Sequence, residues 1–310
     1  FIRQLEIEKI HKVDHKILVA ETPIIKKRIL EIEKSPNIIK KLKDIANKGF
    51  TASMLSSYIR NPIRFYYEKI LEVYEDDLME ETIEYSTIGS IIHDTLEELY
   101  TPIKNKILKT EDVKEMMKIK DEIIDNHFQK KFKEGNINKG KNLIIVEICK
   151  RYVHNFLNKE IKDIEEGNII NIIGIEEKFE CSINLSDEMK DIKIRGKIDR
   201  IDSINGLTRI IDYKTGGQIL QSDLKIKEYD DIFNDTQYSN IFQLLFYCLA
   251  IEQDNKYNFP VESGIISFRN LDNGVIKTTF QDTSTKVTTE KLKGYKEGLS
   301  KLISDILEIN

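Results

Sequence analysis

Two aspartates and a lysine are spaced for phosphate chemistry in the segment GKIDRIDSINGLTRIIDYKTG (196–216). The carboxylates of Asp199 and Asp212 are the kind of ligand that Mg²⁺ or Mn²⁺ prefers, because hard cations bind oxygen atoms. Lys214 follows Asp212 by two residues and could reach a water molecule or a phosphate oxygen. A hard cation and a lysine together supply what phosphodiester hydrolysis needs, namely an activated water and positive charge beside phosphate.

A β-hairpin must position these residues. Asn205-Gly206 predicts a two-residue turn, so residues that face each other have numbers that sum to 411. This register pairs Asp202 with Arg209, whose opposite charges support it, and places Asp199 opposite Asp212. Opposed carboxylates are tolerable when a cation lies between them, whereas a register slip of one residue would separate them onto opposite faces. A charged, solvated face is the alternative interpretation of such an aspartate pair.

The periodicity of apolar residues predicts a helical first half that leads into a small mixed sheet flanked by helices. Residues 1–20 favour a pair of strands. Amphipathic helices are expected within 23–49, 53–71 (two helices divided at Asn61-Pro62), 88–103, 110–134 and 141–166. Strands are expected at 168–185, 191–215, 262–269 and 274–280, with helices at 236–254 and 285–309. The acidic stretch 75–82 is expected to be a loop.

Composition limits the class of protein. The 48 basic and 53 acidic residues give a net charge of −5, which excludes a uniformly basic nucleic-acid coat protein but permits a local basic track.

The cysteines Cys149, Cys181 and Cys248 form no CxxC pair, so neither a disulfide framework nor a four-cysteine metal site is expected. A reducing, cytoplasmic location and no membrane span are predicted. Because the chain opens with Phe1, it is expected to be part of a longer protein.

The sequence motifs of this chain resemble those of a known protein family. GKIDRID (196–202) followed by IDYKTG (211–216) resembles the core of PD-(D/E)XK nucleases, in particular the RecB/AddB-type branch. Three further segments resemble that branch in order, and the resemblance covers about residues 50–280. They are SMLSSYIRNPIRFYYEKIL (53–71), GSIIHDTLEELY (89–100) and QLLFY (243–247).

The resemblance implies a restriction-endonuclease-like α/β core with a helical insertion at about 101–166. It implies that Asp199 and Asp212 are metal ligands with His93 as a third, and that Lys214 positions or activates the water. The remaining residues that it implicates are Gln243 and Tyr247, which would contact DNA or brace the site, and Glu176, a weaker candidate for an accessory role.

One departure from the family affects the expected cofactor. Many members carry a cysteine before the proline of the 53–71 segment and three more near the C-terminus, and these hold a 4Fe–4S cluster. Here Asn61 takes the first position and no cysteine follows Cys248, so no cluster is expected and a cluster-free AddB-like protein fits better. The first residues, FIRQLEIE, resemble the segment that leads from an inactivated helicase-like region into such a nuclease domain. Residues 1–49 are therefore expected to precede the nuclease domain, which would span residues 50–310.

By this resemblance the function is that of a Mg²⁺-dependent (or Mn²⁺-dependent) deoxyribonuclease, with exonuclease action expected, in a helicase–nuclease complex of double-strand-break repair. DNA and a helicase subunit would be its partners, and phosphate contacts would give binding little sequence specificity. Two alternatives remain open: a non-catalytic DNA-binding or scaffolding module, and a structural fragment that completes a larger helicase-like protein.

Overall fold

The computed structural model describes residues 2–10, 12, 14, 16, 31–74, 83–132, 137, 139–185, 190–254 and 256–307. The chain has two compact units, Phe1–Ser35 and Pro36–Asn310. In the first unit, residues Ile2–Glu8 form the helix α1, so the strand predicted there is wrong. The segment is rich in good helix formers, and Gln4 Nε2 donates to Glu8 Oε1 (3.1 Å) one helical turn away. Most of residues 11–20 and the predicted loop at 75–82 lie outside the described residues.

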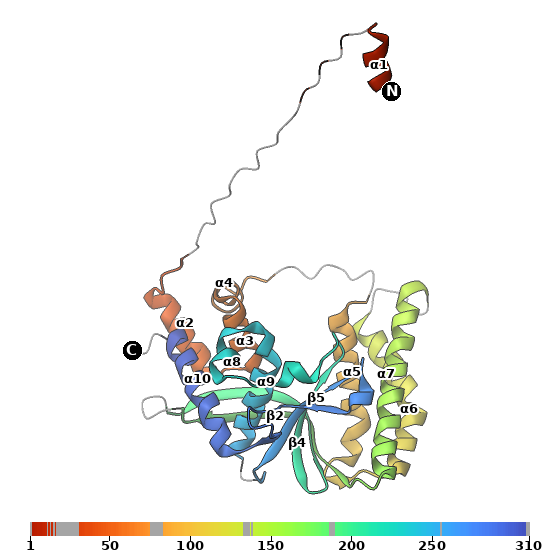
Figure 1. Cartoon of the computed structure of the whole chain (residues 1–310). Coiled ribbons are helices and arrows are strands. Elements are labelled where there is room, and N and C mark those ends of the chain that lie inside the picture. The colour runs from red at the N-terminus through yellow and green to blue at the C-terminus, as the bar shows by residue number, and fades with distance from the viewer. Residues whose placement is uncertain are drawn as a thin grey trace. The chain divides into compact units, whose positions relative to one another are not determined.

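The second unit is built on a seven-stranded mixed sheet among the described residues (Figure 1). The strand order is β1-β2-β3-β4-β5-β6, and β7 pairs with β5. Among these described strands, β4 and β5 run parallel and the other pairs are antiparallel. The strands are β1 (Lys106–Ile107), β2 (Ile170–Ile183), β3 (Ile192–Ile204), β4 (Leu207–Lys214), β5 (Val261–Ser267), β6 (Val275–Lys277) and β7 (Lys286–Val287).

The β3–β4 hairpin confirms the predicted turn and the register from Arg200 to Ile204, whereas the expected Asp199–Asp212 pair lies beyond the paired residues. Asn205 and Gly206 both have positive φ angles, 51° and 87°, as a two-residue turn of this kind requires. The ladder includes the pair Asp202↔Arg209, and its last pair before the site is Arg200↔Ile211.

Helices cover both faces of the sheet. The long predicted helices are confirmed, including the break at Asn61-Pro62, where Asn61 Oδ1 accepts from Arg64 N (3.1 Å) and caps α4. The α-helices are α2 (Pro36–Lys48), α3 (Ala52–Arg60), α4 (Pro62–Phe65), α5 (Tyr85–Tyr100), α6 (Thr110–Lys131), α7 (Gly140–Glu165), α8 (Tyr229–Asn234), α9 (Ser239–Glu252) and α10 (Thr289–Leu307). Short turns of other helix types are η1 (Tyr66–Ile70), η2 (Thr101–Ile103), η3 (Gln221–Leu224), η4 (Thr236–Tyr238) and η5 (Leu271–Asn273).

Each face of the sheet has its own hydrophobic core. Ile210 and Ile265 face a core that includes residues of α2, α3, α9 and α10, whereas their neighbours Ile211 and Ile266 face a core that includes residues of α5, α6 and α7. This alternation follows from the two-residue period of a strand. The mixed sheet between two helical layers confirms the predicted restriction-endonuclease-like class. Within the described residues, no helix combines the length and the apolar character that a membrane crossing needs.

Candidate active site

Helix α5 carries the histidine that the sequence motifs implicate. The apolar side of α5 packs against α6 and α7. His93 lies on the side of α5 that meets β2 and β3. His93 Nδ1 is 2.9 Å from Glu176 Oε1 and 3.5 Å from Asp199 Oδ1. The imidazole also meets the ring of Tyr213 edge-on, with the centroids 5.9 Å apart. Helix α5 thus brings a ring nitrogen to two carboxylates.

Glu176 lies at an irregular point of β2. Its φ angle is 47°, in the left-handed region that a residue with a side chain seldom adopts. Close by, the register of β2 against β3 shifts between Ile172 and Gly174. Such irregularities re-aim side chains, often beside functional sites. The sequence ranked Glu176 only as an accessory candidate, yet the structure places its buried carboxylate in direct contact with His93.

Three possible metal ligands therefore converge. Ligand atoms of His93, Glu176 and Asp199 all lie within 4.8 Å of one another. Both carboxylates are buried, and buried charges of like sign are unfavourable without a compensating cation. Two carboxylates and one imidazole suit Mn²⁺ or Mg²⁺ better than a soft, thiolate-binding metal. The donor set fits the expected cofactor.

The two aspartates of the hairpin take different partners. Asp199 Oδ2 accepts a hydrogen bond from Tyr213 N (2.7 Å), just beyond the end of the β3–β4 ladder. Asp212 Oδ2 lies 2.8 Å from Lys214 Nζ and outside the three-ligand group. Burial of Asp212, together with the negative charge of Asp199, raises the pKa of its carboxyl to about 6 despite the nearby lysine.

Lys214 is held by a chain of side chains that reaches α9. Its Nζ donates to Gln243 Oε1 (3.0 Å), and Gln243 Nε2 donates to Tyr247 Oη (2.7 Å). Gln243 and Tyr247 are one helical turn apart and share a face of α9. Burial, with Asp212 nearby, raises the pKa of Tyr247, so its hydroxyl stays protonated at neutral pH. The structure brings the predicted Gln243 and Tyr247 to Lys214 in a bracing arrangement.

A second lysine at the site was missed by sequence reasoning. Lys197 Nζ lies 2.7 Å from Glu176 Oε2 and 3.7 Å from Glu97 Oε2. The available signal was its position two residues before Asp199, which puts both side chains on one face of β3. Glu176 thus contacts a cation on each side, Lys197 on one and His93 on the other.

The acidic surroundings set the charge of the histidine. Burial alone would lower the pKa of His93, but hydrogen bonds to Asp199 and Glu176 outweigh it and raise the pKa to about 10. Without a metal ion, the imidazole is therefore charged at neutral pH and takes the place of a cation between the carboxylates.

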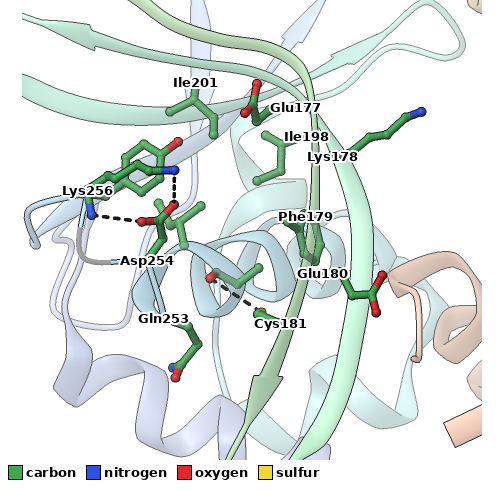
Figure 2. Close-up of a pocket in the computed structure, with 13 residues that line it drawn as sticks. Glu177, Lys178, Phe179, Glu180, Cys181, Ile198, Ile201, Gln253, Asp254 and Lys256 are labelled. Carbon is green, nitrogen blue, oxygen red and sulfur yellow. Dashed lines mark hydrogen bonds and ion pairs between the residues drawn. The ribbon is translucent and has the colours of Figure 1, made fainter. Parts of the chain in front are cut away.

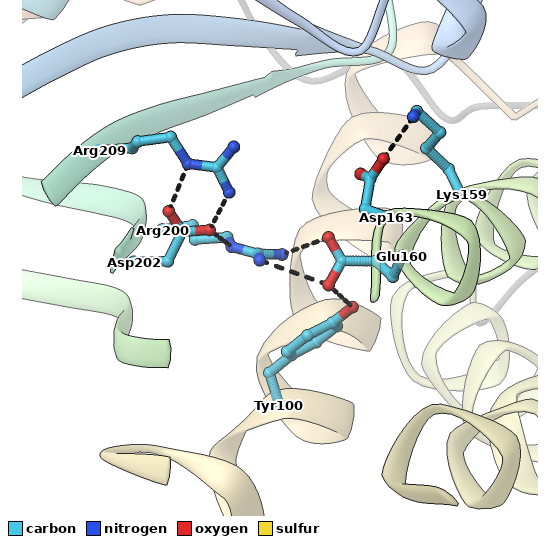
Figure 3. A network of polar contacts seen from close by, with 7 residues as sticks. All are labelled: Tyr100, Lys159, Glu160, Asp163, Arg200, Asp202 and Arg209. Atoms are coloured by element: carbon cyan, nitrogen blue, oxygen red, sulfur yellow. Dashed lines mark hydrogen bonds and ion pairs between the residues drawn. The ribbon is translucent and has the colours of Figure 1, made fainter. Parts of the chain in front are cut away.

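A buried ion network ties β3 to the helices behind it (Figure 3). Arg200 is completely buried, and its Nε donates to Asp202 Oδ2 (2.7 Å) while its terminal nitrogens donate to Glu160 of α7 (3.1 and 3.3 Å). Arg209 Nε donates to Asp202 Oδ1 (2.8 Å), which confirms the predicted cross-strand pair. Tyr100 Oη of α5 donates to Glu160 Oε2 (3.2 Å). The network fixes the strand that carries Asp199 against both helices.

This chain is similar to one known protein family and to several known proteins. The model of the PD-(D/E)XK nuclease superfamily matches residues 49–308. A protein of Clostridium perfringens (strain SM101 / Type A), named as a subunit of an ATP-dependent helicase/deoxyribonuclease, is 30% identical over 304 residues, which cover 89% of this chain and 24% of that protein. Its namesake in strain ATCC 13124 is 29% identical with the same coverage. An uncharacterized protein of Rickettsia bellii (strain RML369-C) is 25% identical over 285 residues, 84% of this chain and 30% of that protein. The chain thus spans about a quarter of the length of the Clostridium relatives.

Proposed function

We propose that residues 50–310 form a metal-dependent nuclease domain that hydrolyses phosphodiester bonds of DNA, because this chain belongs to the PD-(D/E)XK nuclease superfamily. A helical insertion would occupy about 101–166, and residues 1–49 would precede the domain. The observation that carries the proposal is the convergence of His93, Glu176 and Asp199, beside the Asp212–Lys214 pair. These residues come from α5, β2, β3 and β4, and such a set is what phosphodiester hydrolysis requires.

In this proposal each residue has a distinct task. His93, Glu176 and Asp199 would hold Mg²⁺ or Mn²⁺, and Asp212 would complete the acidic set. A bound ion would lower the pKa of a water molecule and offset charge on the phosphate. Lys214 would orient that water or a phosphate oxygen, while Gln243 and Tyr247 keep the lysine in place.

The names of the relatives indicate the assembly. The Clostridium proteins are each named as one subunit of an ATP-dependent helicase/deoxyribonuclease. By analogy, we infer that this chain acts beside a helicase subunit, as a cytoplasmic exonuclease in double-strand-break repair.

The test is a cleavage assay on linear and circular DNA with Mg²⁺, Mn²⁺ or EDTA. Wild type is compared with Asp212→Ala and Lys214→Ala, and with the matched controls Asp272→Ala and Lys114→Ala at exposed positions. We expect metal-dependent cleavage that both site variants lose and both controls keep. Cleavage of linear DNA alone would support exonuclease action.

Two outcomes would contradict the proposal. Cleavage that survives both site substitutions would mean that the chemistry lies elsewhere. DNA binding without cleavage, unaffected by either site substitution and unchanged when the helicase subunit is added, would instead favour the non-catalytic DNA-binding module.

A further inference from the structure

A stripe of basic side chains runs along β3 toward the candidate active site. Lys193, Arg195 and Lys197 occupy alternate positions, so their side chains project from the same face as Asp199. The antiparallel register adds Lys178 of β2, which lies directly opposite Lys197. We call these four residues the basic stripe.

The positive charges of the basic stripe are only partly compensated by neighbouring acidic side chains. Like charges directly opposed on neighbouring strands are destabilising, yet Lys178 faces Lys197. Lys197 is compensated by Glu176, whereas Lys178 and Lys193 are exposed and form no ion pair within the described part of the chain. Figure 2 shows Lys178 pointing away from Ile198 and Ile201, on the outer side of β2. This face therefore carries positive charge that the fold does not neutralise.

Besides Glu176, one other acidic residue of β2 shares the face. Glu180 lies opposite Arg195 in the ladder, and Figure 2 shows it pointing to the same side of β2 as Lys178. Arg195 also donates from Nε to Gly49 O (3.3 Å), which holds the stem of the side chain against the surface. The two exposed lysines flank this arginine and leave the stripe positive overall.

The direction of the stripe identifies its partner. From Lys193 to Asp199 the strand advances six residues, or about 20 Å at roughly 3.3 Å per residue. A row of cations over that length, which ends at a group suited to a metal ion, matches a polyanion whose charges repeat along a line. A nucleic-acid backbone has this form, with one charge per ~3.4 Å of each strand in a duplex and extended spacing in a single strand. The net charge of −5 makes such a local attraction necessary for DNA to approach.

We propose that the basic stripe is a phosphate track, along which one DNA strand lies on the exposed face of β3 as it enters or leaves the active site. This inference rests on the proposed nuclease function and adds the path of the substrate to it. The track contacts phosphates only, so it guides a strand of any sequence.

The salt dependence of DNA binding tests the track. The triple variant Lys178→Gln/Lys193→Gln/Arg195→Gln is compared with Lys114→Gln/Lys130→Gln/Lys141→Gln, which removes the same charge from exposed sites on α6 and α7. Binding of a fluorescein-labelled single strand is followed by anisotropy over a range of NaCl concentrations in EDTA, which prevents cleavage. Lys197 is left intact because it contacts Glu176.

We expect the stripe variant to bind roughly tenfold more weakly than the control variant. The slope of log K against log salt should fall by about 2, since each lost phosphate contact on a single strand contributes ~0.7. The double variant Lys178→Gln/Lys193→Gln, which keeps Arg195 and its contact with Gly49, should lower the slope by about 1.4. The charge-preserving variant Lys178→Arg/Lys193→Arg should bind like wild type.

The results separate this inference from the function on which it rests. Equal affinity and equal slope for the stripe and control variants would overturn the track, while cleavage by wild type would still stand. A wild-type chain that neither binds nor cleaves DNA, alone or with a helicase subunit, would overturn both. Loss of binding in the charge-preserving variant would show that packing and not charge is responsible, and would also reject the track.

Discussion

His93 Nδ1 lies 2.9 Å from Glu176 Oε1, although 83 positions separate the two residues in the chain. The contact joins α5 to the irregular part of β2, and Asp199 of β3 completes the group. Because each ligand comes from a different element, the site exists only when the sheet and α5 are packed together. A metal ion would therefore stabilise the folded chain by linkage, provided that the unfolded chain binds it weakly.

Removal of the Glu176 charge should weaken metal binding. For Glu176→Gln we expect the dissociation constant for Mn²⁺, measured by titration calorimetry, to rise at least roughly tenfold, because a carboxylate ligand becomes a neutral amide. The matched control is Glu180→Gln, a residue of the same strand and type that lies outside the three-ligand group. Equal Mn²⁺ affinity of the two variants would exclude Glu176 as a ligand.

The brace on Lys214 should affect the rate of cleavage more than DNA binding. Gln243→Leu removes the acceptor for Lys214 Nζ and the donor to Tyr247 Oη, so the lysine loses its fixed position. We expect kcat to fall about 10–100-fold, as is typical when a supporting residue is lost, with little change in KM. Steady-state kinetics on a labelled oligonucleotide gives both constants. A rise in KM at constant kcat would instead indicate that Gln243 binds DNA directly.

Local sequence signals predicted the parts of the fold that depend on neighbouring residues. The Asn205-Gly206 turn fixed the hairpin and its register, and helical spacing predicted the long helices. The wrong prediction at α1 also comes from relying on local signals. A segment as short as Ile2–Glu8 fits both the helical and the strand period of apolar residues, so its pattern does not decide between them.

Contacts between distant segments were harder to predict. The roles of Glu176 and Lys197 depend on the irregular backbone of β2 at Glu176 and on the packing of α5, neither of which has a local sequence pattern. The partnership of Arg200 with Glu160 likewise joins residues 40 positions apart. His93 and Gln243 were found only because their motifs resemble a family, since a lone histidine or glutamine on a helix carries no such signal.

The raised pKa of Asp212 makes the acidic site a source of instability in the metal-free chain. The ordinary pKa of 3.8 rises to about 6 in the folded state, so the folded state binds the proton more tightly than the unfolded state. The contribution of Asp212 to stability therefore decreases as pH rises from about 4 to about 6, and the loss remains above that window. A shift of this size corresponds to up to about 3 kcal/mol.

Asp212→Asn removes that penalty. In EDTA at pH 8, we expect the variant to have a free energy of unfolding about 1–3 kcal/mol greater than wild type, with the difference disappearing near pH 4. Urea denaturation at a series of pH values measures it. A variant that is less stable than wild type at pH 8 would show that the ion pair with Lys214 outweighs the cost of burial.

The buried network behind β3 should be the most sensitive point of the fold. Arg200→Leu would leave Asp202 and Glu160 buried with one cation fewer, so we expect a loss of about 3–5 kcal/mol in the free energy of unfolding. Lys159→Met, which breaks the partly exposed pair with Asp163 in the same region (Figure 3), should cost less than about 1 kcal/mol.

Urea denaturation of both variants at neutral pH makes the comparison. The pKa of Asp202 is lowered in the wild type, because its two arginines outweigh the effect of burial, and Arg200→Leu removes one of these two cations. The double variant Arg200→Leu/Asp202→Asn should therefore recover part of the loss, since it removes one of the stranded charges. If Arg200→Leu proves no more destabilising than Lys159→Met, the network does not fix β3, and the position of Asp199 must depend on other contacts such as its hydrogen bond from Tyr213 N.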